Sequence, residues 1–246
     1  MRALILSDLH ANWYALEAVL KDAGSGFDQI ICCGDIVGYN PHPAQVLDWV
    51  RTNCKTVIRG NHDKLVAGLA DPEWFNEIAL AAAVWTRQRL DASQLAYLSA
   101  LPQGPLVLEH FVIWHGSPID EDEYVTAVSE ARPCFQHFDM ALAFFGHTHL
   151  QGGFFSRYGR IGVLDPVPTS EKETVIELQP DSLYMVNPGS IGQPRDDDPR
   201  AAYAIFDSEQ KTVTLRRVAY PVQQTAEDIR RAGLPSMLAQ RLFYGA

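Results

Sequence analysis

The chain has 246 residues, which is enough for one large domain or two small ones. Apolar residues make up 47% of it and charged residues 20%, as in an ordinary folded protein. Thirty acidic residues and twenty basic ones give a formal charge of -10. This charge argues against a protein that mainly binds the phosphate backbone of nucleic acids.

No apolar stretch reaches the roughly 20 residues that a helix needs to span a bilayer, and the N-terminus lacks the layout of a signal peptide. The four cysteines contain no Cys-x-x-Cys pair, so a cysteine-based zinc site is not expected. We predict buried free thiols in a reducing compartment, and therefore a cytoplasmic protein that does not bind membranes.

Apolar runs and helical patterns alternate over the first 60 residues, which predicts an α/β layer arrangement. The apolar runs are typical of strands buried on both faces. Asn12 would cap the first helix, and Asn40 followed by Pro41 would begin the second. The expected strands cover residues 3–6, 30–33 and 56–58, and the expected helices cover residues 13–22 and 41–53.

The rest of the chain changes from helical to β-rich. Residues 117–135 are acidic and interrupted by proline, which predicts a long loop with one short helix. Thr225 has capping-box spacing to Asp228, and Gly233 would stop that helix. We expect helices within residues 73–100, a hairpin of residues 106–108 with 111–114, and strands at residues 141–145, 175–178, 183–186, 202–206 and 213–218.

This order of elements predicts one domain over residues 1–246 with an α/β fold. The expected architecture is a four-layer α/β/β/α sandwich, in which two mixed β-sheets are flanked by helices.

Five short polar clusters each follow an apolar run, where the loop after a strand is expected. Ligands in open α/β sheets gather at the carboxyl ends of strands, so five separate strand ends can converge on one spot. Aspartate, asparagine and histidine are the oxygen and nitrogen ligands that suit borderline divalent metals. The clusters are Asp8-Leu9-His10, Gly34-Asp35, Gly60-Asn61-His62-Asp63, His115-Gly116 and Gly146-His147-Thr148-His149.

A hydrolytic two-metal site needs cations about 3.5–4 Å apart with one group bridging them. Asp35 is the natural bridge, because its two carboxylate oxygens can reach one metal each. Asp8 and His10 can hold the first metal together, and His147 and His149 have the same spacing. Asn61 and His115 complete the set of ligands.

The ordered clusters resemble the calcineurin-like metallophosphoesterase superfamily, and the motifs span residues 8–195. The stretches at residues 34–39 and 187–195 resemble a bacterial and archaeal branch of small members labelled phosphodiesterases, phosphatases or diadenosine tetraphosphate hydrolases. Ala11 departs from the pattern, because many relatives carry glycine there.

The resemblance implies a role for each matched residue. His62 would act as general acid or as a donor to the transition state, and Asp63 would orient its imidazole. A hydroxide bridging the metals would attack phosphorus in line. One metal would take Asp8, His10, Asp35 and His149, and the other would take Asp35, Asn61, His115 and His147.

Other polar and aromatic residues are less specific. Arg195 is either a substrate-phosphate ligand or a surface residue, and Asn187 either caps a loop or lines the site. We expect residues 120–123 and 196–198 to be solvated acidic loops. Trp74, Phe75 and Trp85 are expected in the core rather than as a base-stacking platform.

The predicted function is hydrolysis of a small phosphodiester or dinucleoside polyphosphate with two divalent metal ions, which could be manganese, iron, zinc, cobalt or nickel. A phosphomonoesterase, including one that acts on proteins, is the alternative. A metal-binding interaction scaffold is disfavoured because every ligand and His62 are present. A nuclease for long DNA is disfavoured by the negative charge. The sequence leaves the oligomeric state open.

Overall fold

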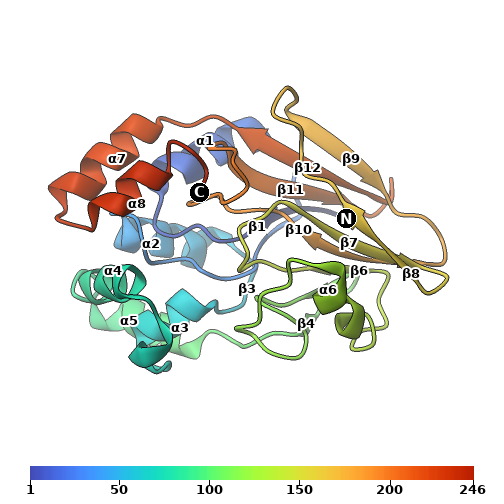
Figure 1. Cartoon of the computed structure of the whole chain (residues 1–246), viewed down its shortest axis with the longest axis horizontal. Coiled ribbons are helices and arrows are strands. Elements are labelled where there is room, and N and C mark those ends of the chain that lie inside the picture. Colours follow the sequence, from blue (N-terminus) through green and yellow to red (C-terminus); the bar gives the residue numbers. More distant parts are fainter.

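A computed structural model describes residues 1–246, and it contains two mixed β-sheets of six strands each. The sheets lie face to face between helices (Figure 1). The first sheet has the order β3-β2-β1-β11-β12-β9, and the second has the order β4-β5-β6-β10-β7-β8. The predicted four-layer α/β/β/α sandwich is therefore confirmed.

In the first sheet, the three N-terminal strands run parallel and the others join them antiparallel. This places the carboxyl ends of the first three strands at one edge, where the polar clusters begin. The strands are β1 Arg2–Leu6, β2 Gln29–Cys32, β3 Thr56–Val57, β9 Glu173–Glu177, β11 Ala201–Asp207 and β12 Thr212–Val218.

In the second sheet, β5, β6 and β10 run parallel, and the predicted hairpin of β4 and β5 is confirmed. The prediction missed β7 and β8, because Gly152 and Gly153 at the start of β7, Gly159 in the turn and Gly162 within β8 interrupt the alternation. The strands are β4 Leu106–Val107, β5 Val112–Ile113, β6 Leu142–Phe144, β7 Gly152–Arg157, β8 Arg160–Leu164 and β10 Ser182–Asn187.

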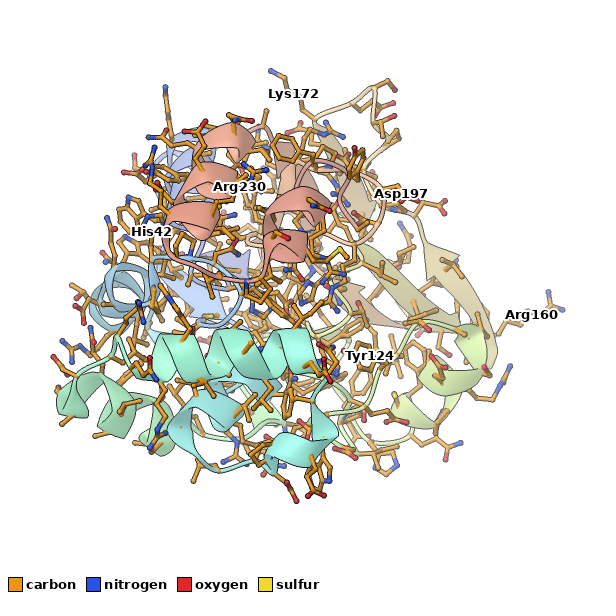
Figure 2. All side chains as sticks on the ribbon, turned by 60° about the vertical axis from the view of Figure 1, so that its left-hand side comes forward. His42, Tyr124, Arg160, Lys172, Asp197 and Arg230 are labelled. Carbon is orange, nitrogen blue, oxygen red and sulfur yellow. The ribbon has the colours of Figure 1, made fainter.

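Helices cover the outer faces of both sheets, and α7 and α8 lie close to α4 (Figure 2). None of the helices is long and apolar enough to cross a bilayer. The helices are α1 Trp13–Ala23, α2 Pro43–Asn53, α3 Asn61–Ala67, η1 Pro72–Trp74, α4 Glu77–Arg87, α5 Ala92–Ala100, α6 Val128–Cys134, α7 Val222–Arg231 and α8 Ser236–Arg241.

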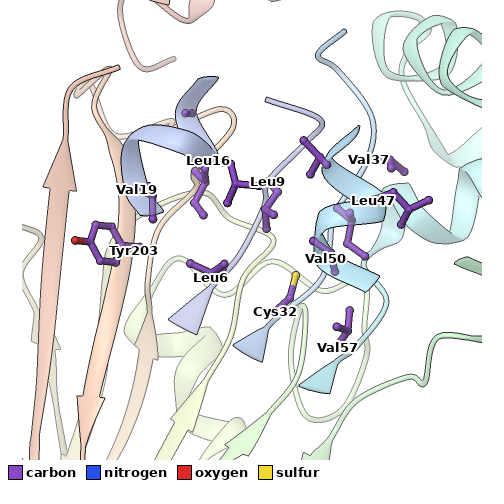
Figure 3. Packing of buried hydrophobic residues seen from close by; sticks show 14 of the residues in the cluster. Leu6, Leu9, Leu16, Val19, Cys32, Val37, Leu47, Val50, Val57 and Tyr203 are labelled. Atoms are coloured by element: carbon purple, nitrogen blue, oxygen red, sulfur yellow. The ribbon is translucent and has the colours of Figure 1, made fainter. Parts of the chain in front are cut away.

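Three apolar layers hold the sandwich together. Ile5, Phe144 and other inward-facing residues fill the space between the sheets. Trp114 of the second sheet region and Cys134 of α6 belong to the apolar layer on the outer face of that sheet. On the outer face of the first sheet, α1 and α2 close over the strands (Figure 3). Burial of this kind contributes about 25 cal/mol for each Å² of apolar surface removed from water. The labelled residues in that layer include Leu6, Leu9, Leu16, Val19, Cys32, Leu47, Val50 and Tyr203.

Two predicted helix starts are wrong. The second helix begins at Pro43, with His42 as its cap. Asn40 instead donates from Nδ2 to His10 O at 2.8 Å, so its side chain is used between loops. The helix α7 begins at Val222, and Thr225 lies inside it. The cap at Asn12 is confirmed, because its side chain accepts a hydrogen bond from Ala15 N.

Candidate metal centre

Five of the seven predicted ligands have backbone in the left-handed region, which L-residues rarely adopt. Such conformations cost about 1–3 kcal/mol each and persist where the surroundings enforce them. They turn the chain sharply at the end of a strand, so that each side chain points back over the sheet edge. The φ values are 51° at Asp8, 44° at His10, 53° at Asp35, 67° at His147 and 61° at His149.

Hydrogen bonds between backbones join these loops to each other. Asp8 N donates to Gly34 O at 3.0 Å, and His10 N donates to Asp35 O at 2.9 Å. The approach is so close that a Cβ on Gly60 would stand 2.1 Å from Asp35 Oδ1. Only glycine fits at position 60, which explains why a glycine directly precedes Asn61.

The first predicted ligand group comes together. His10 Nε2 lies 3.0 Å from His149 Nε2 and 3.4 Å from Asp35 Oδ2. His149 Nε2 lies 3.4 Å from Asp8 Oδ1. All four side chains are buried, and one ligand atom from each lies within 4.8 Å of the others.

The second group comes together beside it. His115 Nε2 lies 3.4 Å from Asp35 Oδ2 and 3.2 Å from Asn61 Oδ1. His147 Nδ1 lies 3.0 Å from the same oxygen of Asn61. Asp35, His115 and His147 are buried and also have ligand atoms within 4.8 Å of one another.

Asp35 belongs to both groups, but it reaches them through one oxygen. Oδ1 accepts a hydrogen bond from His62 N at 2.8 Å, so it is already engaged. Oδ2 lies 3.4 Å from both His10 Nε2 and His115 Nε2. This arrangement favours a bridge through Oδ2, and the expectation that each oxygen reaches a separate metal stays a prediction.

Backbone carbonyls fix the tautomer of each clustered histidine. The ring nitrogen that points away from the cluster lies 3.0 Å from Val37 O in His10 and 2.8 Å from Cys33 O in His115. A carbonyl can only accept, so that nitrogen carries a proton and the other faces the cluster, where a metal ion would take its lone pair. The same rule holds for the other two histidines. His149 Nδ1 lies 2.5 Å from Gln193 O, and His147 Nε2 lies 3.1 Å from Asp122 O.

Burial and mutual charges set the ionisation of the cluster. Burial lowers the pKa of His147 to about 3 and the pKa of His10 and His149 well below the usual range, so these imidazoles are neutral ligands. Burial also raises the pKa of Asp8 to about 7. Burial opposes the charges of Asp35 and His115, but their mutual attraction outweighs it: it raises the pKa of His115 to about 10 and holds the pKa of Asp35 well below the usual range.

The donor set fits divalent cations. Ligand atoms at 2.0–2.1 Å around a tetrahedral ion stand roughly 3.3 Å apart, and roughly 3.0 Å apart around an octahedral one. The separations of 3.0–3.4 Å quoted above fall in that range. In addition, Asp8 Oδ2 and Asp35 Oδ2 are buried without a hydrogen-bond partner. Both oxygens lack a partner, and Asp35 Oδ2 also faces Nε2 of His10 and of His115, so a bound cation would offset their desolvation.

His62 lies beside the cluster on α3, with its ring 4.9 Å from His10 and 4.3 Å from Tyr39. Burial lowers its pKa to about 4, and the charge of Asp35 offsets only part of this. The neutral imidazole can therefore offer one N–H to a substrate oxygen.

The expectation that Asp63 orients His62 is wrong. Asp63 Oδ1 accepts from Ile36 N at 2.9 Å and Val37 N at 3.1 Å, and Oδ2 accepts from Gly60 N at 3.0 Å. Asp63 thus fixes the loop that carries Asp35, because the first turn of α3 points its carboxylate toward that loop rather than toward the imidazole.

A cleft of about 160 Å³ opens above the cluster, and Asn61, His62 and His147 lie on its floor. Phe75 and Trp74 line one part of it, and Trp74 is 73% exposed. The prediction that Trp74 belongs to the core is wrong, because the short η1 helix turns the indole outward at the mouth.

The loop predicted within residues 117–135 borders this cleft through Asp122 and Tyr124. Tyr124 stacks on His147 with ring centroids 3.9 Å apart, and it lies at the end of α4 in Figure 2. The acidic run in this loop is not simply solvated, because Glu121 and Asp122 both pair with Lys64. Arg59 pairs with Glu121 at 2.8 Å. The loop is therefore tied to α3 next to the cluster.

The acidic run at residues 196–198 also differs from expectation. Asp196 pairs with the buried Arg217, and Asp198 is buried beside Arg200. Asp196 and Asp198 fasten the loop after β10 to Arg217 of β12, and Arg200 pairs with Asp198 within the loop.

Asn187 does not bind substrate in this arrangement. It is 1% exposed, and its Nδ2 donates to Gly146 O at 2.9 Å and to Thr148 Oγ1 at 3.0 Å. Its side chain holds the loop of His147 and His149 in place. Arg195 lies closer to the cleft, with Nη2 3.3 Å from Tyr39 OH.

Tyr39 and Gln193 both contact the cluster, but sequence reasoning did not single them out. Tyr39 packs against His10 and His62, and Gln193 O receives the His149 N–H. Both stand within the motif stretches at residues 34–39 and 187–195, and this proximity to ligands was the available signal.

Comparisons with known proteins agree with this geometry. The model of the calcineurin-like phosphoesterase superfamily domain matches residues 1–211. An uncharacterized protein of Methanocaldococcus jannaschii is 33% identical over 98% of this chain and 97% of its own length. The crystal structure of a metallophosphoesterase from Sphaerobacter thermophilus is 38% identical, with a TM-score of 0.87 over 100% of this chain and 99% of that one. A hypothetical protein from Pyrococcus horikoshii OT3 has the same fold, with 22% identity and a TM-score of 0.78 over 100% of this chain and 98% of that one.

The family match covers most of the chain, and the relatives match its whole length. The chain therefore belongs to the calcineurin-like phosphoesterase superfamily, and it is a metal-dependent phosphoesterase of a family that uses two divalent metal ions.

Proposed function

We propose that the chain hydrolyses small phosphodiesters or dinucleoside polyphosphates. In this proposal Asp8, His10, Asp35 and His149 hold one divalent metal ion. Asp35, Asn61, His115 and His147 hold the other.

One observation carries the proposal: a single unpartnered oxygen, Asp35 Oδ2, faces two groups of ligands beneath a small cleft. Two bound cations would activate water as a nucleophile and neutralise charge on the phosphoryl group. Imidazole, carboxylate and amide ligands of this kind accept manganese, iron, zinc, cobalt or nickel.

The residues of the chain would position and stabilise the substrate. The N–H of His62 would donate to a phosphoryl or leaving-group oxygen, since its imidazole lines the cleft and has no carboxylate partner. Phe75, Trp74 and Tyr124 would exclude water from one side of the scissile phosphate. They also offer flat apolar surface to a planar organic group, which favours an aryl or nucleoside ester.

The size of the cleft supports small substrates. Its volume of about 160 Å³ holds a phosphate with part of one substituent. The loop at Asp122 and Tyr124 is fixed by ion pairs to Lys64, so the mouth does not widen without breaking them. We therefore expect poor turnover of phosphoproteins and of duplex DNA.

The test is a panel of phosphate esters assayed with manganese present. We expect kcat/KM for bis-nitrophenyl phosphate and for diadenosine tetraphosphate to exceed kcat/KM for nitrophenyl phosphate by at least about tenfold. A tenfold difference corresponds to about 1.36 kcal/mol in activation free energy. Higher kcat/KM for the monoester would establish the alternative, a phosphomonoesterase. Failure to hydrolyse any member of the panel would favour the scaffold role.

The free cysteines, of which Cys32 and Cys33 are fully buried, support a reducing compartment, and we propose the cytoplasm.

A further inference from the structure

Two arginines converge on one neutral side chain near the cleft. Arg195 Nη2 donates to Gln193 Oε1 at 3.1 Å, and Arg241 Nη1 donates to the same oxygen at 3.2 Å. Arg195 Nη2 also lies 3.3 Å from Tyr39 OH, and Arg241 Nε donates to Ala246 O at 2.5 Å. Neither guanidinium pairs with an aspartate or glutamate, and both donate to the same uncharged amide oxygen, while Arg241 also bonds Ala246.

This arrangement is unusual within the chain, which has thirty acidic residues against twenty basic ones. Several other arginines that are at least partly buried pair with carboxylates, as Arg217 does with Asp196 and Arg59 does with Glu121. By contrast, Arg195 Nε is buried without any hydrogen-bond partner. Burial lowers the pKa of Arg241, and repulsion by the charge of Arg195 lowers it further. An anion between the two guanidiniums would remove this repulsion.

The arginine pair lies next to the candidate metal centre. The side chain of Gln193 accepts hydrogen bonds from both arginines, and its backbone carbonyl oxygen lies 2.5 Å from His149 Nδ1. The ring of Tyr39 packs 4.3 Å from His62, and its hydroxyl meets Arg195.

The cleft continues toward Arg241. Tyr39 and Asn76 line both the cleft over His62 and a neighbouring hollow of about 410 Å³ that Arg241 also lines. Glu77 is the acidic residue in that hollow, and it pairs with neither arginine. An extended substrate can therefore run from the metal centre past Tyr39 to the two guanidiniums.

We propose, building on the function proposed above, that Arg195 and Arg241 bind a second phosphate of the substrate. Guanidinium groups present several N–H donors in a fixed plane, and they bind phosphate oxygens in pairs. The preferred substrates then contain a phosphoanhydride chain, as in dinucleoside polyphosphates and nucleoside diphosphate derivatives. An isolated diester fills only the metal centre.

The test compares Arg195→Gln and Arg241→Gln with the wild-type chain. Arg157→Gln is the matched control, because it removes the same charge from an exposed position on β7. The measured quantity is the ratio of kcat/KM for diadenosine tetraphosphate to kcat/KM for bis-nitrophenyl phosphate, with saturating manganese. We expect each variant at the pair to lower this ratio by about 10- to 150-fold, as for a lost charge-assisted hydrogen bond. The control should keep the wild-type ratio, and a ratio within about threefold of wild type in both test variants would overturn the proposal.

A second measurement tests the anion site without turnover. Metal-free protein is titrated calorimetrically with imidodiphosphate in the presence of a chelator, and thermal denaturation confirms that each variant is folded. Wild type and Arg157→Gln should bind more tightly than both variants at the pair by at least about tenfold. Equal binding by all four proteins would refute the anion site. If the wild type hydrolysed neither ester but bound imidodiphosphate as expected, the proposed function would fail while the anion site stood.

Discussion

Replacement of His62 by glutamine tests how the substrate is stabilised. The imidazole packs against Tyr39, His10 and Phe75, and it accepts no hydrogen bond from the loops that carry the ligands. His62→Gln should therefore keep the fold and both metal ions. Loss of the ring contacts, at about 0.5–1.5 kcal/mol for each aromatic pair, should lower the melting temperature by a few degrees.

The expected loss of activity follows from the neutral imidazole. A hydrogen bond to a charged group contributes about 1.5–3 kcal/mol, which corresponds to about 10- to 150-fold in kcat at 1.36 kcal/mol for each factor of ten. A general acid would contribute about 10²–10⁴-fold. Because burial lowers the pKa of His62 to about 4 and Asp63 does not contact the ring, we expect the smaller range.

The assay is kcat for a series of aryl and alkyl diesters whose leaving groups differ in pKa, with bound metal counted by elemental analysis. A donor to the phosphoryl oxygens gives a deficit that is similar across the series. A deficit that grows steeply with leaving-group pKa, beyond about 150-fold, would refute the reasoning and make His62 a general acid. Loss of a metal ion would instead make it a ligand.

Three further predictions follow from other contacts. Asp35→Asn should lose most of both metal ions and nearly all activity, because its Oδ2 belongs to both ligand groups, and full retention of two ions on elemental analysis would contradict this. Trp74→Ala should raise KM for diadenosine tetraphosphate about 5- to 150-fold, the range for one lost base–aromatic stack, whereas Tyr158→Ala on the β7–β8 hairpin should not change it. Burial opposes the charge on Glu121, but Arg59 and Lys64 outweigh this effect and lower the pKa of Glu121 below the ordinary 4.5. The ionised carboxylate therefore stabilises the fold above pH 4.5. This contribution is lost as the pH falls through the lowered pKa. Urea unfolding should thus show a deficit of about 1 kcal/mol for Glu121→Gln at pH 7 that shrinks toward pH 3, and an equal deficit at both pH values would count against the ion pairs.

The ligand set could be predicted because its signal is local. Each polar cluster stands directly after an apolar run, and parallel strands bring their carboxyl ends together whatever the loops do in detail. The layer order followed from the same alternation. The single domain over residues 1–246 stays a prediction, as do the metal assignments of the individual ligands.

The partners of the ligands could not be predicted, because they depend on placement in three dimensions. Asp63 stands next to His62 in the sequence, but the first turn of α3 sends its carboxylate to the backbone at Ile36 and Val37. That helix itself was missed, since Asn61, His62 and Asp63 give no apolar period at its start. Trp74 is apolar and was placed in the core, yet a three-residue turn carries it to the surface.

The left-handed backbone of five ligands ties the heat resistance of this protein to its supply of metal. Each strained residue raises the free energy of the folded chain by about 1 kcal/mol or more, and the buried carboxylates of Asp8 and Asp35 add mutual repulsion. Ions that bind only the folded form add about 2.7 kcal/mol at a hundred times their dissociation constant. A shortage of metal would thus lower the stability of the protein as well as its activity. A melting curve recorded in cell extract would report the metal occupancy of the site.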